Sequence, residues 1–259
     1  MLITAGAGMG IDSGLPDFRG INGFWGKYPA LLKLGINFEE MASPHWFIDN
    51  PHLAWGFYSH RWMLYKKTQP HEGFAILYSL VRNKRSFFVF TSNVDGHFQK
   101  AGFHENHILE CHGSINHLQC FNNCGQALWS LPEDYKFSID QDTLLAKDPL
   151  PYCPSCRGIA RPNILMFSDA SWDFVRSDEQ NSNFTEWLNS NKFRSLTIIE
   201  IGAGIDVPTV RMTSESLYRD WHKNVTFIRI NPQDFDSPPG TYVIKMSALQ
   251  ALRQFGKKK

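Results

Sequence analysis

Three glycines at alternate positions, Gly6, Gly8 and Gly10, follow the short apolar run Met1–Ile3 and constrain the fold of this chain most. Glycine lets the backbone turn sharply and approach a ligand closely, and N–H groups near a helix start attract an anion. The pattern therefore predicts a strand that ends in a phosphate-binding loop, with a nucleotide as ligand. Because Ile11 stands where the strict dinucleotide fingerprint has a further glycine, a glycine-rich turn without a ligand is the alternative.

The loop continues with Pro16-Asp17-Phe18-Arg19, which places a rigid turn, a carboxylate, an aromatic ring and a guanidinium beyond the glycines. The whole run resembles the signature of the sirtuins, the NAD-dependent protein deacylases, although Gly10 stands where the family usually has serine. The resemblance implies that Phe18 shields a charged intermediate from water while Asp17 and Arg19 order the loop. The NAD-binding residues that it implies here are Gly6, Ala7, Gly8, Asp17, Phe18 and Arg19.

At 259 residues the chain can form one large domain or a large domain with a small satellite, and we favour the second. Its formal net charge of +1 indicates no general attraction to nucleic acid or to an anionic membrane. No stretch approaches the roughly 20 apolar residues that span a bilayer, and no charged-then-apolar leader opens the chain. We therefore expect a cytoplasmic protein with no membrane or direct nucleic-acid partner, whose oligomeric state the sequence leaves open.

Aromatic residues recur at spacings near three and four from about residue 21 to 85, which favours packed helices. Ser43 and Asn50 each precede a proline, so we expect them to cap helix starts. Apolar runs of strand length are typical of a buried parallel sheet. The predicted later strands are 86–91, 196–201, 225–232 and 242–245.

Polar residues follow the strand at 86–91, where α/β proteins place their ligands. Asn93 and Asp95 offer an amide and a carboxylate, although a turn that caps the next helix would use the same residue types. The run Thr91–Asp95 resembles the sirtuin Thr-Gln-Asn-Ile-Asp element, which implies that Asn93 and Asp95 hold the ribose and the nicotinamide amide. Ser92 replaces the family's ribose-binding glutamine and is shorter, so that contact must be dropped, moved or bridged by water.

His112 follows an apolar pair and precedes Gly113-Ser114, which resembles the sirtuin His-Gly element whose histidine is the general base. An imidazole with a pKa near ~6.5 can take a proton from a sugar hydroxyl at neutral pH. The resemblance implies that the acyl oxygen attacks C1′ of the nicotinamide ribose, and that His112 then activates a ribose hydroxyl. The implied catalytic residues are therefore His112 and Asn93.

Four of the five cysteines form two pairs, Cys120 with Cys124 and Cys153 with Cys156. This spacing suits a tetrahedral Zn²⁺ site of four thiolates, which leaves no open position and is therefore structural. Disulfides are the weaker alternative without a secretory leader, and a redox Cys-x-x-Cys would leave the other pair unexplained. Cys111 lies outside the set.

Two further segments resemble the sirtuin edges between which an acyl-lysine peptide is inserted as a strand. The first is Arg161–Asp169, in which Ser168 replaces a family glycine and Asp169 a glutamate, and the second is Asp206–Pro208. Such an added strand gains affinity from main-chain hydrogen bonds. The implied peptide contacts are Leu165, Phe167 and Val207.

The last strands end in two more cofactor elements that the resemblance implies. Gly202-Ala203-Gly204 stands in place of the family's Gly-Thr-Ser turn and lacks both hydroxyls, so Gly202 and Gly204 must bind the cofactor through backbone amides. Asn231 matches the sirtuin asparagine at the adenosine ribose.

Tyr58 and Arg61 are three residues apart in the helical segment, so they share a helix face. They resemble the Tyr-x-x-Arg pair by which one class of sirtuins binds malonyl-, succinyl- or glutaryl-lysine, and Arg can clamp a carboxylate in two hydrogen bonds. The alternative is an ordinary surface arginine beside a core tyrosine.

Together these matches predict an α/β fold, a Rossmann-type parallel sheet with an inserted helical module and a small zinc-ribbon module. The expected boundaries are 1–30, 86–118 and 161–259 for the NAD-binding domain, 31–85 for the helical module and 119–160 for the zinc ribbon. The expected function is NAD-dependent removal of acyl groups from protein lysines, with NAD and Zn²⁺ as cofactors. The alternatives are a sirtuin-fold ADP-ribosyltransferase or NAD-hydrolysing enzyme, and a catalytically silent NAD-binding module.

Overall fold

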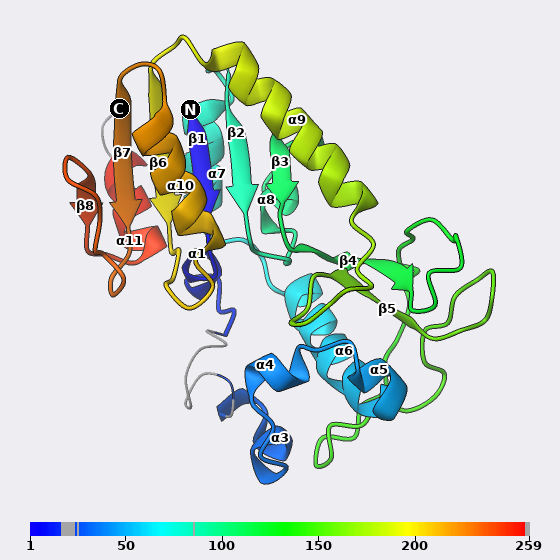
Figure 1. Cartoon of the computed structure of the whole chain (residues 1–259). Coiled ribbons are helices and arrows are strands. Elements are labelled where there is room, and N and C mark those ends of the chain that lie inside the picture. The colour runs from blue at the N-terminus through cyan, green and yellow to red at the C-terminus, as the bar shows by residue number, and fades with distance from the viewer. Residues whose placement is uncertain (17–23, 25, 85, 257–259) are drawn as a thin grey trace.

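The computed structural model describes residues 1–16, 24, 26–84 and 86–256. The upper part in Figure 1 is a six-stranded sheet whose neighbouring strands run parallel, in the order β3-β2-β1-β6-β7-β8. Counted along the chain, this is the order 3-2-1-4-5-6 of a Rossmann-type sheet, which confirms the predicted fold class. The strands are β1 Leu2–Ala5, β2 Phe88–Thr91, β3 Ile108–Glu110, β6 Leu196–Ile201, β7 Val225–Ile230 and β8 Tyr242–Ile244.

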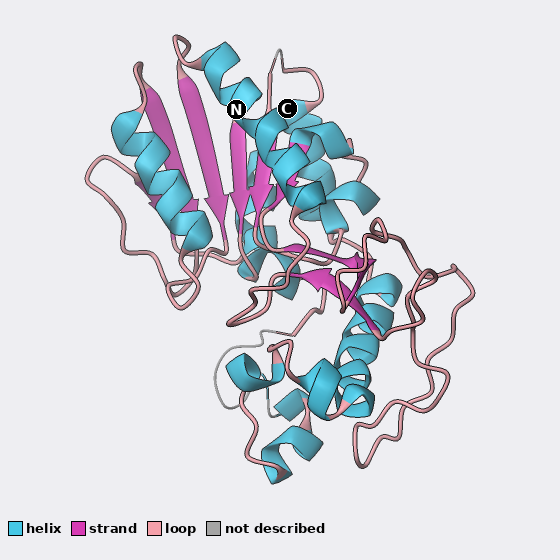
Figure 2. Cartoon of the chain, turned by 45° about the vertical axis from the view of Figure 1, so that its right-hand side comes forward, coloured by secondary structure: helices cyan, strands magenta, loops and turns pink. Residues whose placement is uncertain are grey.

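Helices cover both faces of this sheet (Figure 2). Successive residues of a strand point to opposite faces, so Ile3 packs with α7 and α11 whereas its neighbour Leu2 packs with α9 and α10. Because both faces are buried, the strands appear in the sequence as continuous apolar runs. The four helices are α7 Glu72–Val81, α11 Ala248–Gly256, α9 Val175–Asn191 and α10 Thr209–Asp220.

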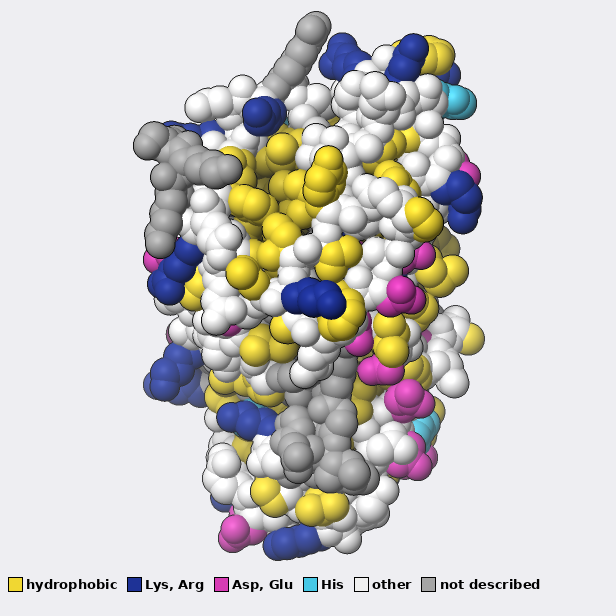
Figure 3. Space-filling model, turned by 90° about the vertical axis from the view of Figure 1, so that its left-hand side faces the viewer, with side chains coloured by type: hydrophobic (Ala, Val, Ile, Leu, Met, Phe, Trp, Pro, Cys, Tyr) yellow, Lys and Arg dark blue, Asp and Glu magenta, His cyan; other side chains and the backbone are white. Residues whose placement is uncertain are grey.

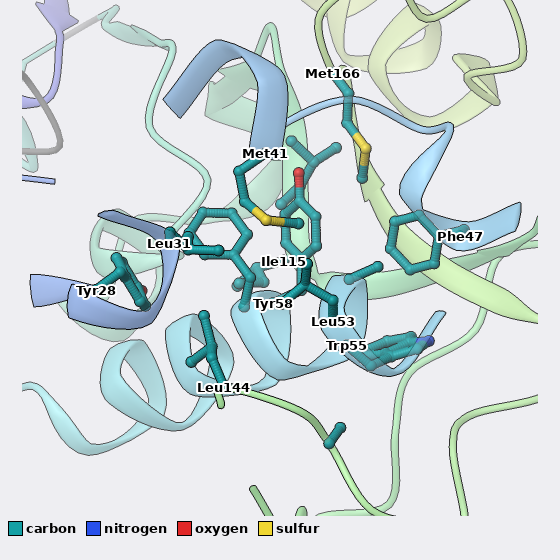
Figure 4. Close-up of a cluster of buried hydrophobic side chains, with 14 of the residues drawn as sticks. Tyr28, Leu31, Met41, Phe47, Leu53, Trp55, Tyr58, Ile115, Leu144 and Met166 are labelled. Atoms are coloured by element: carbon teal, nitrogen blue, oxygen red, sulfur yellow. The ribbon is translucent and has the colours of Figure 1, made fainter. Parts of the chain in front are cut away.

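A second hydrophobic core lies below the sheet, where short helices meet an antiparallel ribbon (Figures 1 and 4). Phe47 packs against Trp55 and Tyr58, and the Trp55 indole N–H donates to the carbonyl of Ala160 at 2.9 Å. Core packing of this kind confirms the predicted helical reading of the aromatic segment. The elements are α3 Pro29–Lys33, α4 Phe38–Met41, α5 Trp46–Asp49, α6 Pro51–Lys67, β4 Gly113–Cys120 and β5 Ala160–Ile164.

Of the two predicted helix caps, one is confirmed. The Asn50 side chain accepts from the backbone N–H of Leu53 at 3.0 Å, and Pro51 is the first residue of α6. The prediction for Ser43 is wrong, because α5 begins later and the Ser43 hydroxyl instead pairs with the ring of His45 at 2.7 Å.

The division into three modules stays a prediction. Helix α7, which the sequence placed in the helical module, belongs to the core of the sheet, since Phe74, Leu77 and Val81 pack in the cluster that contains Ile3 and Val89. The hydrophobic pattern of α7 identifies a buried face, but it does not say which core that face joins.

The remaining described elements are the short α1 Gly8–Ile11, α8 His97–Lys100 and the 3-10 turn η1 Glu105–His107. Strand β8 forms one edge of the sheet with Tyr242 and Val243 exposed, and Figure 3 shows apolar side chains gathered on this face. Within the described ranges, every helix is too short or too polar to cross a membrane.

Candidate active site

A cavity of about 730 Å³ lies at the carboxyl end of the sheet, between the strand ends and the lower core. This is where ligands of open α/β sheets bind. The structure brings most of the predicted site residues together here. Those that line the cavity are Gly6, Ala7, Tyr58, Arg61, Ser92, Asn93, Asp95, His112, Leu165, Phe167, Gly204 and Val207.

Three of the predicted cofactor-binding residues do not line the cavity. Gly8, Gly202 and Asn231 are not among the described residues that line the cavity. Asp17, Phe18 and Arg19 fall outside the described residues, so the roles expected of them stay predictions.

Gly8 and Gly202 pack the first glycine loop against the loop after β6. The Gly8 N–H donates to the Gly202 carbonyl at 3.0 Å, and a Cβ on Gly202, whose φ is +60°, would lie 2.4 Å from the Gly8 carbonyl carbon. Only glycine permits this approach. The two residues therefore have a structural role in shaping the loops, while direct cofactor binding by them stays a prediction.

Thr91, the last residue of β2, fixes the polar residues that follow it. Its hydroxyl donates to the carbonyl of Ala5 at 2.9 Å and accepts from the Asn93 N–H at 3.0 Å. Asp95 is buried and accepts from the His97 N–H at 2.9 Å, which caps α8. Hydrogen bonds thus hold the Asn93 backbone and the Asp95 carboxylate at the cavity. No separate role was expected of Thr91, although a polar residue that ends a buried strand is the signal for one.

His112 lies in the turn between β3 and β4. Gly113 has φ +76°, and a Cβ there would meet the Asn163 carbonyl oxygen at 2.1 Å, so glycine at position 113 is a steric requirement of the turn. Nε2 of His112 is 3.3 Å from the hydroxyl of Thr209, the first residue of α10. Burial lowers the pKa of His112, so at neutral pH the ring is uncharged and can accept a proton.

Tyr58 and Arg61 are both buried, at 1% and 6% exposure, so the alternative of a surface arginine is wrong. The Arg61 guanidinium donates to the Tyr65 hydroxyl at 2.9 Å and lies 5.3 Å from the Phe57 ring centroid. Burial raises the pKa of Tyr58 to about 12, so it remains a neutral hydrogen-bond donor. No partner for the buried Tyr58 hydroxyl occurs among the described residues.

The first predicted peptide edge follows β5. The Leu165 N–H donates to the His112 carbonyl at 3.0 Å, and the Leu165 side chain is 38% exposed. Ser168 has φ +55°, which is the left-handed region that favours glycine. The next residue, Asp169, forms a buried ion pair with Arg161 that holds the pKa of Asp169 below its ordinary value.

Asn231 follows β7 and uses all of its polar side-chain atoms, its amide nitrogen in the turn after β6 and its oxygen in the turn after β7. Its amide donates to the Ala203 carbonyl at 2.9 Å, and its oxygen accepts from the N–H groups of Gln233 and Asp234, each at 3.0 Å. The expected contact with a ribose stays a prediction.

The four paired cysteines converge in the ribbon. Their sulfur atoms all lie within 4.8 Å of one another, with Cys120 and Cys156 at 3.5 Å and Cys124 and Cys153 at 3.6 Å. Four thiolates at ~2.3 Å from Zn²⁺ in a tetrahedron are about 3.8 Å apart, so this donor set fits the ion. Cys111 lies outside the cluster, as predicted.

Comparison with known proteins agrees with this geometry. The model of the Sir2 family matches residues 6–188. The NAD-dependent protein deacylase of Aquifex aeolicus (strain VF5) is 35% identical over 170 residues, which are 66% of this chain and 62% of that protein. Sirtuin-5, a mitochondrial NAD-dependent protein deacylase of Xenopus tropicalis, is 32% identical over 186 residues, covering 64% of this chain and 55% of that protein. The chain spans less than two thirds of the length of these relatives.

Solved structures share the fold over nearly the whole chain. A Sir2 homolog–NAD complex has a TM-score of 0.68 and 22% identity, covering 98% of this chain and 86% of that one. A sirtuin structure described as the structural basis of sirtuin substrate affinity has a TM-score of 0.69 and 20% identity. The match covers 98% of this chain and 91% of that one. The family match extends over more than half of the 259 residues, and this chain therefore belongs to the Sir2 family, the sirtuins.

Proposed function

We propose that this protein removes acyl groups from lysine side chains of proteins with NAD as co-substrate, yielding nicotinamide and O-acyl-ADP-ribose. The observation that carries the proposal is that His112, Asn93, Asp95 and the glycine loop line one cavity with both predicted peptide edges. Relatives named NAD-dependent protein deacylase support it.

The residues that line the cavity would have different roles in this reaction. NAD would supply the ribose carbon that accepts the acyl oxygen as nicotinamide leaves. Asn93 and Asp95 would hold the ribose and the carboxamide, because both residues line the cavity just after the end of β2. His112 would accept the proton of a ribose hydroxyl, with Thr209 orienting the ring. The apolar part of the cavity wall would help to exclude water, which competes with the transfer.

Analysis of the NAD products by mass spectrometry tests this function. With NAD and an acyl-lysine peptide, we expect nicotinamide, O-acyl-ADP-ribose and a peptide lighter by the acyl group. Free ADP-ribose formed without any deacylated peptide would favour NAD hydrolysis, and a peptide heavier by ADP-ribose would favour a transferase. Absence of all products would favour the silent module.

The proposal extends to the acyl group. Arg61 brings a permanent positive charge to the cavity wall, and Tyr58 adds a neutral hydroxyl donor close to it. A carboxylate at the end of a malonyl or succinyl chain could accept from both. The burial of the two side chains supports a specific binding site, because an ordinary arginine would extend into water.

Arg61→Met is expected to erase a preference for succinyl- or malonyl-lysine while sparing deacetylation. Hydrogen bonds to a charged group contribute about 1.5–3 kcal/mol, so kcat/KM for the acidic acyl groups should fall by about 10- to 100-fold. Tyr58→Phe, which removes one hydroxyl only, is the matched control and should cause a smaller loss. A wild-type enzyme that strongly prefers acetyl-lysine would refute this assignment.

The four-cysteine cluster would hold a structural Zn²⁺, and a cytoplasmic location is part of the same proposal. Cysteines that converge on a metal site remain reduced, which suits a reducing compartment.

A further inference from the structure

His71 lies outside the cavity, yet it connects the glycine loop to the helix layer on one face of the sheet. It is the residue before α7, and its ring has two different partners. Nδ1 accepts from the N–H of Gly73 at 2.9 Å, and Nε2 lies 3.0 Å from the carbonyl oxygen of Met9 in α1. The ring thus bridges the end of one helix and the start of another.

These partners define the state of the ring. Because a backbone N–H can only donate and a carbonyl can only accept, Nδ1 must accept and Nε2 must donate, which is the neutral Nε2–H tautomer. Burial lowers the pKa of His71, and Arg253 acts in the same direction, although the bond to Met9 and the carboxylates of Asp12 and Glu72 oppose the shift. The neutral ring is the form present at pH 7.

The fit of the ring depends on Gly73. A Cβ at that position would lie 2.5 Å from Cε1 and 2.7 Å from Nδ1 of His71, so any other residue would displace the ring. A bare glycine within the first turn of a helix costs stability, and here it makes room for the imidazole.

Two further contacts hold the same loop. The His71 N–H donates to the Ser13 hydroxyl at 3.0 Å, and Asp12 accepts from the N–H of Leu249 at the start of α11, at 2.7 Å. Both ends of the loop line the cavity, through Gly6 and Ala7 on one side and Leu15 and Pro16 on the other. Residues near the starts of α7 and α11 thus hold the middle of the glycine loop, through contacts that lie outside the cavity.

We propose that His71 is a positioning residue that holds the glycine loop in its nucleotide-binding conformation. The inference rests on the proposed function, because that function makes the pyrophosphate of NAD the ligand of the loop. It does not require His71 to touch that ligand. An anion site built from backbone N–H groups binds well only if the loop is already in place, so loosening the loop weakens affinity.

Two substitutions separate this role from simple helix capping. In His71→Asn the amide oxygen can take the place of Nδ1 and keep the cap of α7, while the bond to Met9 is lost. In His71→Gln the amide nitrogen can take the place of Nε2 and keep the bond to Met9, while the cap is lost. His104→Asn is the control, because the His104 ring also accepts from an N–H two residues later, at 3.3 Å, but at the far end of β3.

The experiment measures NAD affinity by titration calorimetry, the urea midpoint of unfolding, and amide hydrogen exchange without NAD. For His71→Asn we expect faster exchange at Gly10–Gly14 and a Kd for NAD raised about 2- to 10-fold, the range for one hydrogen bond, with the urea midpoint lowered no more than in His71→Gln. For His71→Gln we expect faster exchange in the first turn of α7 and a lower midpoint, with the Kd unchanged. His104→Asn should leave the loop and the Kd as in the wild type.

If the amide hydrogen exchange of the glycine loop is unchanged in His71→Asn, the inference is overturned. A Kd that rises in both variants in proportion to lost stability would also overturn it, because His71 would then be an ordinary cap. If the wild-type protein binds no NAD, the proposed function fails, and the loop exchange still decides whether His71 positions the loop.

Discussion

His112→Ala is expected to lower deacylation by about 10²–10⁴-fold, the usual effect of removing a general base. The loss should appear in kcat, whereas the Kd for NAD and the urea midpoint should stay near wild type. The His112 ring is hydrogen-bonded to Thr209, and the backbone bond of His112 to Leu165 survives the substitution. Turnover of an acyl-lysine peptide, followed by mass spectrometry, measures the effect.

The pH profile gives an independent check of the same role. Burial lowers the pKa of His112, so the neutral ring persists below the ordinary value of ~6.5 and is lost only as pH falls through the lower value. The acid limb of kcat/KM should therefore lie below pH ~6.5 and should be absent from the residual activity of His112→Ala. Thr209→Val should reduce kcat less than His112→Ala does. Full turnover by His112→Ala would remove the residue from the mechanism.

Much of the fold is predictable from the sequence because the physical constraints are local. Strands buried on both faces must be apolar throughout, and the glycine loop follows the first of them. The cysteine spacing likewise predicts a convergence of four sulfur atoms that the structure confirms. The packing of α7 does not follow from local sequence. Its apolar residues Phe74, Leu77 and Val81 pack on the sheet, and this depends on which face of the sheet is left uncovered by other helices.

The roles of single site residues are less predictable, because a residue type does not name its partner. Cofactor binding by Gly8 and Gly202 stays a prediction, whereas their close approach to one another is a steric reason for both glycines that the motif does not reveal. Asn231 uses its amide to hold a turn. Conversely, no sequence motif identifies the roles of Thr91 and His71. Their roles follow from hydrogen bonds to residues that are distant in the sequence.

Loss of any one ribbon cysteine should abolish metal binding. Wild-type protein is expected to hold one equivalent of Zn²⁺, and Cys153→Ser none, because three remaining thiolates cannot complete the closed tetrahedral site. The ion would connect the two arms of the ribbon, since Cys120 ends β4 beside Ala160 of β5 while Cys153 precedes β5. Structural zinc contributes on the order of 10 kcal/mol in small zinc domains, so the ribbon should lose much of its order.

The consequence for function follows from what the ribbon supports. Strand β5 leads directly into Leu165 at the peptide edge, so a loosened ribbon should raise KM for the peptide more than it lowers kcat. Metal analysis and the kinetics of Cys153→Ser measure both effects, and Cys111→Ser is the matched control, expected to retain one Zn²⁺ and wild-type kinetics. The four-cysteine site would be contradicted if Cys153→Ser retained one full equivalent of zinc, or if Cys111→Ser lost it. The sulfur of Cys111 lies outside the cluster, so it cannot replace a missing ligand without moving the turn at His112.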